Sequence, residues 1–437
     1  MKRMNALVLG LCVLFMGPVY ADPMPVLDSG NTAWMLTSTA LVLFMTLPGL
    51  ALFYGGLVRT RNVLSILMQC FAITAVVSLM WLIGLYSLAF TQGGSWNAWL
   101  GGSSRILFAG MGRETLGPHG VPEVLFAMYQ MTFAIITPAL IIGGYAERVR
   151  FSSMLVFSAL WTLFVYTPVC HWVWGGGFLQ QKGLLDYAGG TVVHITAGIA
   201  SLVAALTLGA RKGFPRQSMA PHNMTMTVTG AGMLWVGWFG FNAGSALAAD
   251  GAASMALAVT HISAATGALT WMFLEWWRFG KPSVLGIVTG MVAGLGTITP
   301  AAGSVGPGGA LLVGLSAGII CFLMTQLVKR VWAIDDSLDV FPVHGIGGIL
   351  GTLMAGLLCS PSLGVFSGMG MASQNHSLSE QFFVQLQGVG VTLGYTAVVT
   401  WLVIKVTSWL TGPMRVSGDQ ETEGLDLVLH EERGYDL

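Results

Sequence analysis

Charged side chains are scarce in this chain of 437 residues, where Asp, Glu, Lys and Arg together make up 9%. A soluble globular domain carries about 25%, so the composition excludes an ordinary soluble enzyme or binding domain. Neither sign of charge is in excess, since 19 basic residues face 19 acidic ones. This balance provides no basic surface for nucleic acid, and we expect no nucleic-acid partner.

Cysteine and enzyme motifs are also in short supply. The five cysteines have neither paired nor metal-ligand spacing; Cys12 lies near the amino terminus, and the other four lie in apolar segments as expected for buried, space-filling thiols. No HExxH motif occurs, and no nucleophile elbow of the GxSxG type is expected. A site of two histidines would lack a third metal ligand. We therefore expect no enzyme activity, no cofactor and no bound metal.

Long apolar runs, by contrast, fill the chain, in which 54% of the residues are hydrophobic and the mean hydropathy is +0.73. A run of about 20 apolar residues can cross a bilayer as a helix. The sequence therefore predicts an all-α polytopic membrane protein. Its eleven expected transmembrane helices are 32–56, 62–90, 121–146, 151–174, 190–210, 223–244, 249–277, 283–303, 308–329, 341–360 and 382–412.

The amino-terminal residues 1–21 have the features of a secretory signal peptide. Lys2 and Arg3 form a basic start, residues 7–16 are apolar, and residues 19–21 end in a small residue suited to cleavage. An uncleaved anchor is the alternative. Cleavage would leave a membrane domain at 22–412 whose amino terminus lies outside the cytoplasm.

The distribution of positive charge predicts the same orientation. An outside start and an odd number of spans place the carboxyl terminus in the cytoplasm. Of the Lys and Arg residues beyond residue 21, only Arg105, Arg113 and Lys182 fall on expected outer loops. Because cytoplasmic loops are enriched in Lys and Arg, we expect a multi-pass protein of the cell inner (plasma) membrane.

Two stretches of the chain, 186–206 and 336–356, align with each other without a gap, and each places a histidine eight residues after an aspartate. The identical pairs are Asp186 with Asp336, Val193 with Val343, His194 with His344, Gly198 with Gly348, Ile199 with Ile349 and Ala205 with Ala355. These stretches belong to the fifth and tenth spans. An odd offset between repeats inverts one relative to the other, which predicts an inverted five-plus-five repeat with one extra carboxyl-terminal helix.

The two histidines are expected to meet near the middle of the bilayer. His194 follows Asp186 by eight helical residues, a rise of about 12 Å, and half of the hydrocarbon core is about 15 Å. His344 reaches a similar depth from the other side. A lone intramembrane histidine could be a hydrogen-bonded packing residue, but ionisable groups in spans cost roughly 3 kcal/mol and mark substrate or proton paths. The matched pair therefore favours a transporter or channel.

Several longer motifs carry a resemblance to a known family. They are DYAGGTVVH at 186–194 with Arg211 beyond it, WGGG at 174–177, GWFGFNAGS at 237–245, AERVRF at 146–151 and FYGGLVRTRNVLS at 53–65. Together they resemble the ammonium transporter (Amt) branch of the Amt/Rh family, in its bacterial form with a cleaved signal peptide. The resemblance extends over nearly the whole mature chain and implies a homotrimer in which each subunit encloses its own pore.

The resemblance also implies an outer site that recruits ammonium. Trp174, Ser245 and Phe133 match the residues of that site. The chemistry agrees, because the two aromatic faces attract a small cation and the hydroxyl can accept a hydrogen bond.

Further roles follow from the same resemblance. Phe133 and Phe241 match a stacked pair that gates the pore, and Trp238, His194 and His344 match residues that line it. Moving an ammonium-sized ion into a low-dielectric medium has an idealised cost of about 20 kcal/mol. We therefore expect ammonium or methylammonium to lose its proton at the outer site, while potassium, which has none to lose, is excluded.

Four residues qualify this picture. Tyr129 stands where many relatives have Phe, and Leu338 and Pro342 differ from the residues common before the second histidine. Asp186 could bind the cation directly, but it opens a helix, where a carboxylate caps free amides. The resemblance places it behind the pore wall, as structural support of the outer site.

The polar tail at 413–437 bears on partners and on alternatives. EGLD at 423–426, with His430 and Tyr435, resembles the Amt tail that packs under the trimer and responds to a PII-type signalling protein. An ammonium sensor acting through this tail, or an Rh-like neutral gas channel, are the alternative functions.

Overall fold

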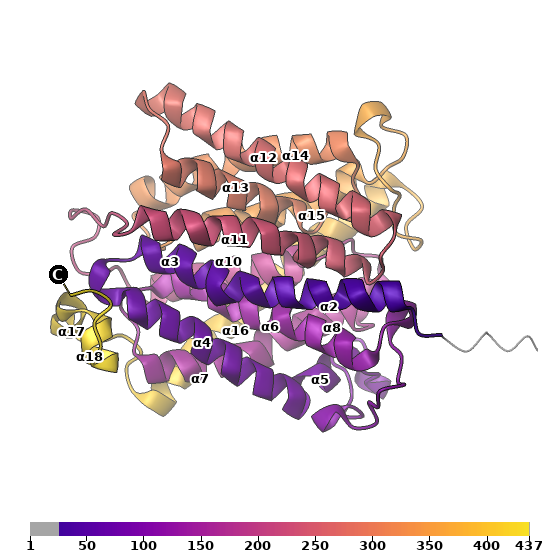
Figure 1. Ribbon diagram of the computed structural model, residues 1–437, viewed down its shortest axis with the longest axis horizontal. Helices are drawn as coiled ribbons and strands as arrows, with labels where there is room; N and C mark the ends of the chain where they lie inside the picture. Colours follow the sequence, from indigo (N-terminus) through magenta and orange to yellow (C-terminus); the bar gives the residue numbers. More distant parts are fainter. Residues whose placement is uncertain (1–25, 437) are drawn as a thin grey trace, which may run out of the picture.

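The computed structural model describes residues 26–436, so the expected signal peptide at 1–21 lies outside the described residues. Across the described range the chain is helical and forms no strand beyond two isolated bridges, Leu116 with Pro122 and Val149 with Arg415. The long helices run side by side along one axis of the molecule (Figure 1). The expectation of an all-α fold is confirmed.

In the described part of the chain, three long helices contain a short π-helical stretch that joins two α-helical parts, and three others begin or end with such a stretch. In the first half of the chain the helical segments are α2 (Ser29–Phe44), η1 (Met45–Leu50), α3 (Ala51–Leu57), α4 (Val63–Met80), η3 (Trp81–Leu85), α5 (Tyr86–Phe90), α6 (Glu123–Tyr145), α7 (Phe151–Trp161), η7 (Thr162–Tyr166), α8 (Thr167–Trp174), α9 (Phe178–Gln181), η8 (Gly190–Ile195) and α10 (Thr196–Leu208). In the second half they are α11 (Met224–Ala243), α12 (Gly251–Phe279), α13 (Val284–Ile298), α14 (Pro307–Gln326), η10 (Leu327–Val331), η11 (Phe341–Gly345), α15 (Ile346–Leu358), α16 (Leu378–Thr411), α17 (Gly418–Glu423) and α18 (Leu425–His430). Short 3-10 turns occupy the loops at Thr60–Asn62, Gly94–Trp96, Ile106–Phe108, Pro118–Gly120, Gly244–Ala246 and Gly364–Phe366.

Nine helical segments between residues 26 and 436 are long and apolar enough to cross a membrane. The described chain is therefore a multi-pass membrane protein by length and composition. Each of the eleven expected ranges contains a helix, but α11 is not among the nine and α13 is an apolar helix of only 15 residues. The count of eleven crossings thus remains a prediction.

The end of the eighth expected span was placed too far along the chain, while its start agrees with the structure. We expected it at 283–303, whereas α13 ends at Ile298 and residues 299–304 form a buried turn. Pro300 contributes to this end, because proline has no N–H to continue the hydrogen-bond ladder and its ring clashes with the carbonyl of the residue four positions before it. Ala301 and Ala302 made the apolar run look longer than the helix is, although Pro300 and Gly303 are residues typical of a turn.

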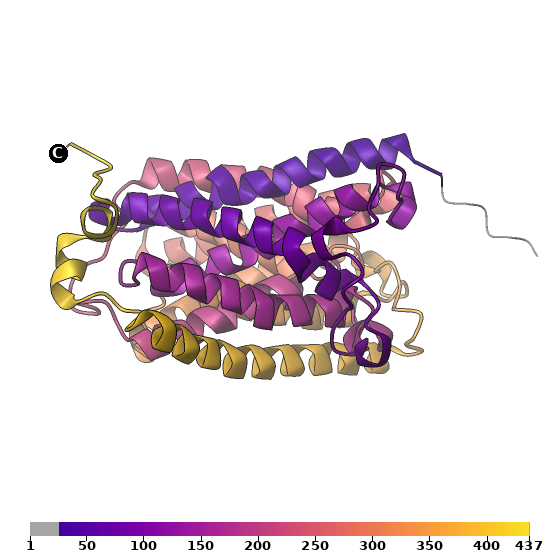
Figure 2. The same cartoon turned by 90° about the horizontal axis from the view of Figure 1, so that it is seen from below.

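The core of the bundle is formed around α6. In α6, 83% of the most apolar stretch is buried, compared with 33% in α16. Figure 2 shows α16 running along one side of the bundle for most of its length. Helix α6 packs against α10, which also contacts η11, while α15 contacts η8. Each histidine-bearing segment, η8 or η11, therefore packs in the interior against the helix that follows the other one.

The two ends of the bundle are distinct. Helices α17 and α18 gather at one end, here named the tail end, and the chain enters at residue 26 near the opposite, far end (Figure 1). The tail docks on α4, where Asp426 accepts hydrogen bonds from the Leu64 and Ser65 backbone N–H groups at 3.0 and 2.7 Å. Glu421 accepts others from the Lys212 N–H and Arg415. A carboxylate at the N-terminus of a helix is favoured by the free amides and the helix dipole.

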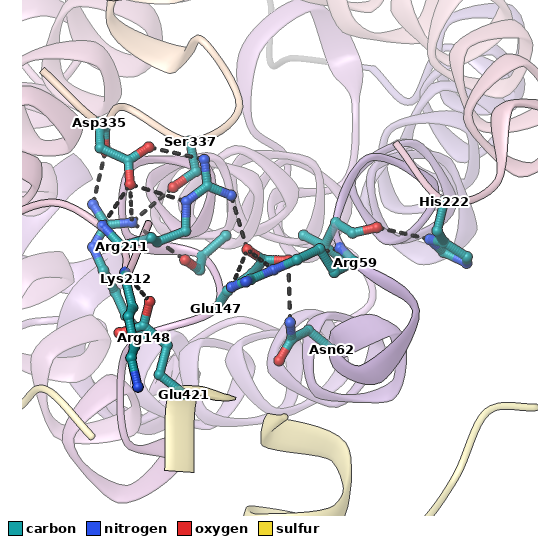
Figure 3. A network of polar contacts seen from close by, with 12 residues as sticks. Arg59, Asn62, Glu147, Arg148, Arg211, Lys212, His222, Asp335, Ser337 and Glu421 are labelled. Atoms are coloured by element: carbon teal, nitrogen blue, oxygen red, sulfur yellow. Dashed lines mark hydrogen bonds and ion pairs between the residues drawn. The ribbon is translucent and has the colours of Figure 1, made fainter. Parts of the chain in front are cut away.

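An ion-pair network holds the loops of the tail end together (Figure 3). Glu147 pairs with Arg59 and Arg211 at 2.9 and 2.8 Å, and Asp335 pairs with Arg211 at 2.8 Å and lies 3.9 Å from Arg148. Burial alone would raise the pKa of Glu147, but Arg211 and Arg59 outweigh it and the pKa is lowered. Both carboxylates are therefore charged, and the network fixes the loop that leads into the second histidine segment.

Candidate functional site

The two matched histidines meet at the centre of the bundle. His194 lies in η8 and His344 in η11, both are at most 4% exposed, and their Nδ1 atoms are 3.2 Å apart. The rings are nearly parallel, with centroids 5.2 Å apart. Only one of two facing nitrogens can carry the hydrogen of this bond. The neutral pair therefore has one Nε2 that donates and one that accepts, so the two rings set each other's tautomer.

Aromatic and aliphatic side chains surround the pair and form a central cavity. Trp238 stacks on His194 with centroids 5.6 Å apart, and its Nε1–H donates to Thr299 Oγ1 at 2.9 Å. The ring of Phe241 also lies near the His194 ring, with centroids 6.2 Å apart. The remaining wall of the central cavity consists of Met45, Leu50, Phe53, Ile136, Leu140, Val193, Leu234 and Val292. This wall is apolar apart from the two imidazoles.

A stacked phenylalanine pair separates the central cavity from a second cavity at the far end. The ring centroids of Phe133 and Phe241 are 4.2 Å apart, and both rings are buried. Phe133 and Trp174 meet edge to face at 5.9 Å. The far-end cavity is lined by Phe90, Pro118, Phe126, Gln130, Phe133, Trp174, Gln180, Tyr187, Ser245 and Leu247. The three residues expected to form the outer site thus line one cavity, above the expected gate.

Tyr129 supports this site from behind. It is fully buried, and its hydroxyl lies 2.9 Å from the Gly240 and Phe241 carbonyl oxygens and 3.3 Å from Ser245 Oγ. Ser245 Oγ in turn donates to the Phe241 carbonyl at 2.9 Å. The departure at position 129 therefore adds a hydroxyl that anchors the end of α11, which carries Phe241, and the turn after it, which carries Ser245.

Asp186 is occupied by its own helix start. Its carboxylate accepts hydrogen bonds from the backbone N–H groups of Gly189, Gly190, Thr191 and Val192, at 2.8, 2.6, 2.7 and 3.3 Å, and from the Thr191 hydroxyl. Its backbone carbonyl accepts the Trp174 Nε1–H at 2.8 Å. The side chain is 6% exposed and does not line the far-end cavity. This arrangement agrees with structural support of the outer site and not with direct binding of a cation.

A third cavity opens at the tail end and shares His344, Phe53 and Val292 with the central one. Its charged lining is Lys329 with Asp339, whose Nζ and Oδ2 atoms are 2.7 Å apart. We did not expect a role for this pair. The self-alignment contained the signal, because Asp339 occupies the position of Gly189 in the first stretch, where no side chain exists.

The segment before His344 differs from its counterpart before His194. Asp336 accepts one hydrogen bond at Oδ2, from the Phe341 N–H at 2.7 Å, while Oδ1 is buried without a partner in the described chain. Burial and the neighbouring charge of Asp339 raise the pKa of Asp336 to about 7. Leu338 lines the tail-end cavity, and Pro342 is buried at the start of η11.

Close glycine contacts hold the two histidine segments together. A Cβ added at Gly198 in α10 would lie 2.2 Å from the Cα and N atoms of Gly345. A Cβ added at Gly348 in α15 would lie 2.9 Å from His194 Cβ and 3.1 Å from Ile195 Cγ1. Gly198 therefore packs against the residue after His344, and Gly348 packs against His194 itself.

The expectations about cysteines and enzyme motifs can also be compared with the structure. Cys70, Cys170, Cys321 and Cys359 are buried free thiols, as expected, whereas Cys12 lies outside the described residues. The letters GxSxG do occur, contrary to our expectation, at 314–318. They lie in the middle of α14 and not at the strand-to-helix turn that exposes such a serine. Among residues 26–436, no three His, Cys, Asp or Glu side chains form a cluster suited to a metal.

Known proteins resemble the chain over almost its whole length. The Ammonium Transporter Family matches residues 33–435. An ammonium transporter of Aquifex aeolicus is 46% identical over 415 residues, covering 94% of both chains. The crystal structure of Saccharomyces cerevisiae Mep2 is similar with a TM-score of 0.81 and 35% identity, over 92% of this chain and 93% of that one. A solved structure described as a sensor Amt protein has a TM-score of 0.84 and 25% identity, over 92% of this chain and 98% of that one.

These similarities agree with the cavities, the paired histidines and the apolar helices described above. The family consists of transporters and not of enzymes. The chain belongs to the ammonium transporter family, and it is a multi-pass membrane protein that transports ammonium.

Proposed function

We propose that ammonium is recruited in the far-end cavity, loses its proton there, and crosses the central cavity as ammonia. Trp174, Phe133 and Ser245 supply two aromatic faces and a hydroxyl at the entrance. Phe133 and Phe241 form the gate, because Phe133 lines the far-end cavity, Phe241 lines the central one, and their ring centroids are 4.2 Å apart. The observation that carries this proposal is the order of the cavities: a cation site first, an aromatic closure next, and an apolar chamber with one buried imidazole pair after it.

The apolar chamber explains why the crossing species is neutral. An ion of ammonium size would exchange its water shell for the side chains of the central cavity, which are aliphatic or aromatic apart from the two imidazoles. Such a wall cannot replace the hydration shell, as the carbonyl rings of a potassium filter do. Ammonia avoids most of the desolvation cost. It can donate to or accept from the Nε2 atoms of His194 and His344, and Trp238 narrows the same chamber.

The proton released from ammonium needs a separate account. Because the Nδ1 atoms of the two histidines share a hydrogen, a proton taken up at one Nε2 can be released at the other after the shared hydrogen shifts between the rings. The twin histidines are therefore a candidate route for the proton as well as a lining for ammonia. This step would make the net transport carry charge.

Several broader features belong to the same proposal. The far end faces outward and the tail end the cytoplasm, in the inner membrane, which puts most Lys and Arg residues inside. The reciprocal contacts of Gly198 and Gly348 support the inverted repeat. The protein assembles as a homotrimer after removal of residues 1–21, and its docked tail at 413–437 is the contact for a PII-type signalling protein.

The test is transport by the purified protein in liposomes. Ammonium and methylammonium should produce current, whereas potassium should produce none, and liposomes without protein provide the baseline. Equal currents with ammonium and potassium would contradict deprotonation. Alkalinisation of the liposome interior without current would contradict the proton route and favour a neutral gas channel instead.

A matched pair of tryptophan variants tests the recruitment site. Trp174→Leu removes one cation-attracting face from the far-end cavity and the hydrogen bond to the Asp186 carbonyl. We expect the half-saturating ammonium concentration to rise about tenfold, the change for an interaction of about 1.4 kcal/mol. Trp401→Leu, on α16 and 47% exposed, is the control and should change nothing. Equal effects of the two substitutions would refute the recruitment role of Trp174.

A further inference from the structure

The tail-end cavity contains an ion pair at the point where the proposed path leaves the membrane. The cavity shares His344, Phe53 and Val292 with the central cavity, so it is the next chamber on the path. Lys329 Nζ and Asp339 Oδ2 are 2.7 Å apart in its wall. Both side chains keep contact with solvent, at 31% and 21% exposure. The pair therefore lies between the buried imidazoles and the aqueous phase.

The carboxylate has capacity for another donor. Asp339 Oδ2 is bound to Lys329, but Oδ1 is buried without a partner in the described part of the chain. An unpartnered carboxylate oxygen in a buried position is costly. Burial raises the pKa of Asp339, while the charge of Lys329 opposes that rise. The other charges that act on Asp339 are Asp335 and Asp336 of the same loop and Arg211, which already binds Asp335.

The backbone presents this carboxylate at a position that the matching stretch leaves empty. Asp339 and Gly189 occupy equivalent positions in the two aligned stretches, and both have a positive φ, 61° and 116°. A non-glycine residue in this region is uncommon, although Asp and Asn tolerate it better than most. The far end thus has no side chain here and relies on aromatic faces, while the tail end has a carboxylate.

Lys329 is chemically a tethered form of the substrate. Its head group is a primary ammonium ion, and Asp339 binds it at the distance of a charge-assisted hydrogen bond. A free ammonium ion has the same charge and the same kind of N–H donor, with a fourth hydrogen in place of the stem. A carboxylate that accepts one can accept the other when the lysine moves aside, and the four-carbon stem of lysine is flexible.

We propose that Asp339 binds ammonium at the tail-end mouth and that Lys329 is its built-in competitor, which displaces the ion into the aqueous phase. This inference rests on the path proposed above, in which ammonia leaving the central cavity takes back a proton released at the Nε2 atom of His344 and so becomes ammonium again. A carboxylate without the lysine would hold ammonium and slow its release. The tethered competitor is always present at a high effective concentration, so it keeps occupancy of the site short.

The experiment measures the affinity of the tail-end mouth alone. Right-side-out membrane vesicles are preloaded with unlabelled ammonium, and entry of 15N-ammonium is followed by mass spectrometry. Internal ammonium should inhibit entry, and the half-inhibitory concentration reports the inner site. Lys329→Met should lower it about tenfold and Asp339→Asn should raise it about tenfold, as expected for one charge-assisted hydrogen bond gained or lost. Asparagine keeps the positive φ acceptable.

The opposite direction of the two shifts separates the proposal from a structural ion pair, because loss of a structural pair would affect both variants alike. Lys281→Gln is the control, since Lys281 is exposed at the same end and lines neither cavity. The half-saturating external ammonium concentration should not change in either variant. Shifts of the half-inhibitory concentration in the same direction for both variants, or no shift, would overturn this proposal. If instead the proposed outer recruitment site is wrong, Trp174→Leu will leave the half-saturating external ammonium concentration unchanged.

Discussion

Two aspartates at equivalent positions, Asp186 and Asp336, have very different surroundings. Asp186 accepts five hydrogen bonds from its own helix start, whereas Asp336 accepts one and leaves Oδ1 without a partner in the described residues. The same residue eight positions before a histidine is thus a saturated cap in one half and an unsaturated carboxyl group in the other. The two aligned stretches share the position of the aspartate but not its chemistry.

The cause lies in the residues that follow each aspartate. Thr191 donates to Asp186 through both its N–H and its hydroxyl, and its counterpart Phe341 has only the N–H. Val192 also donates, at 3.3 Å, but its counterpart Pro342 has no N–H. Two substitutions therefore account for two of the four hydrogen bonds by which the aspartates differ. The half at the far end gains a rigid support, and the half at the tail end gains a carboxyl group that responds to its neighbours.

The largest expected difference comes from removing each carboxylate. Asp186→Ala leaves five buried donors without an acceptor, and at about 1–3 kcal/mol each this loss rivals the whole stability of a domain. We expect little folded protein and no transport, while Asp186→Glu should retain part of both. Asp336→Ala removes one acceptor and should leave most of the folded protein. Size-exclusion profiles and ammonium uptake at matched membrane levels test the difference, and full activity of Asp186→Ala would reject any role for that residue.

The histidines provide a second comparison, in which the two halves should prove equivalent. Because the Nδ1 atoms share one hydrogen, replacing either histidine removes the hydrogen-bond partner that fixes the tautomer of the other. His194→Asp and His344→Asp should each lower selectivity for ammonium over potassium, and the double variant should lose little more than the worse single one, as coupled sites do. Currents normalised to membrane protein measure this. Additive losses with unchanged selectivity would leave the pair as packing residues.

The smallest expected effect concerns pH. The carboxyl of Asp336 ionises at about 3.9 in an unfolded chain but at about 7 in the fold, where burial acts first and Asp339 second. Between these values the folded state holds a proton that the unfolded state has lost, so stability falls as pH rises through this window. Asp336→Asn should remove that fall, which is at most a few kcal/mol. Melting temperatures from pH 5 to 8 test it, with Asp419→Asn as an exposed control; a slope equal in all three proteins would contradict the shift.

Much of the fold could be predicted from the sequence, because a membrane helix appears there as a long run of apolar residues. The expected ranges and the helices agree within a few residues for most spans, and the all-α character is confirmed. The exception at 283–303 shows the limit. Residues 299–304 are mostly buried although they form a turn, and a window of apolar residues does not show where inside it the helix ends.

The candidate site was predictable where the two halves match and less so where they differ. Identity between the stretches pointed to His194 and His344, and the family motifs pointed to Trp174, Phe133 and Ser245. Asp339 was missed because a carboxylate opposite a glycine reads as a mismatch, and Lys329 because its partner lies ten residues away across a turn. Tertiary contacts of this kind have no local sequence signal.

The glycine contact between α10 and η11 has a consequence for the geometry of the pore. Gly198 meets the backbone of Gly345, one residue from His344, and a Cβ at position 198 would come within 2.2 Å of it. Because the obstacle is backbone, no rotamer change can make room. The close approach of these two backbones therefore sets the distance between the two imidazoles. A single methyl group added at position 198, outside the pore, would push the two segments apart and increase that distance.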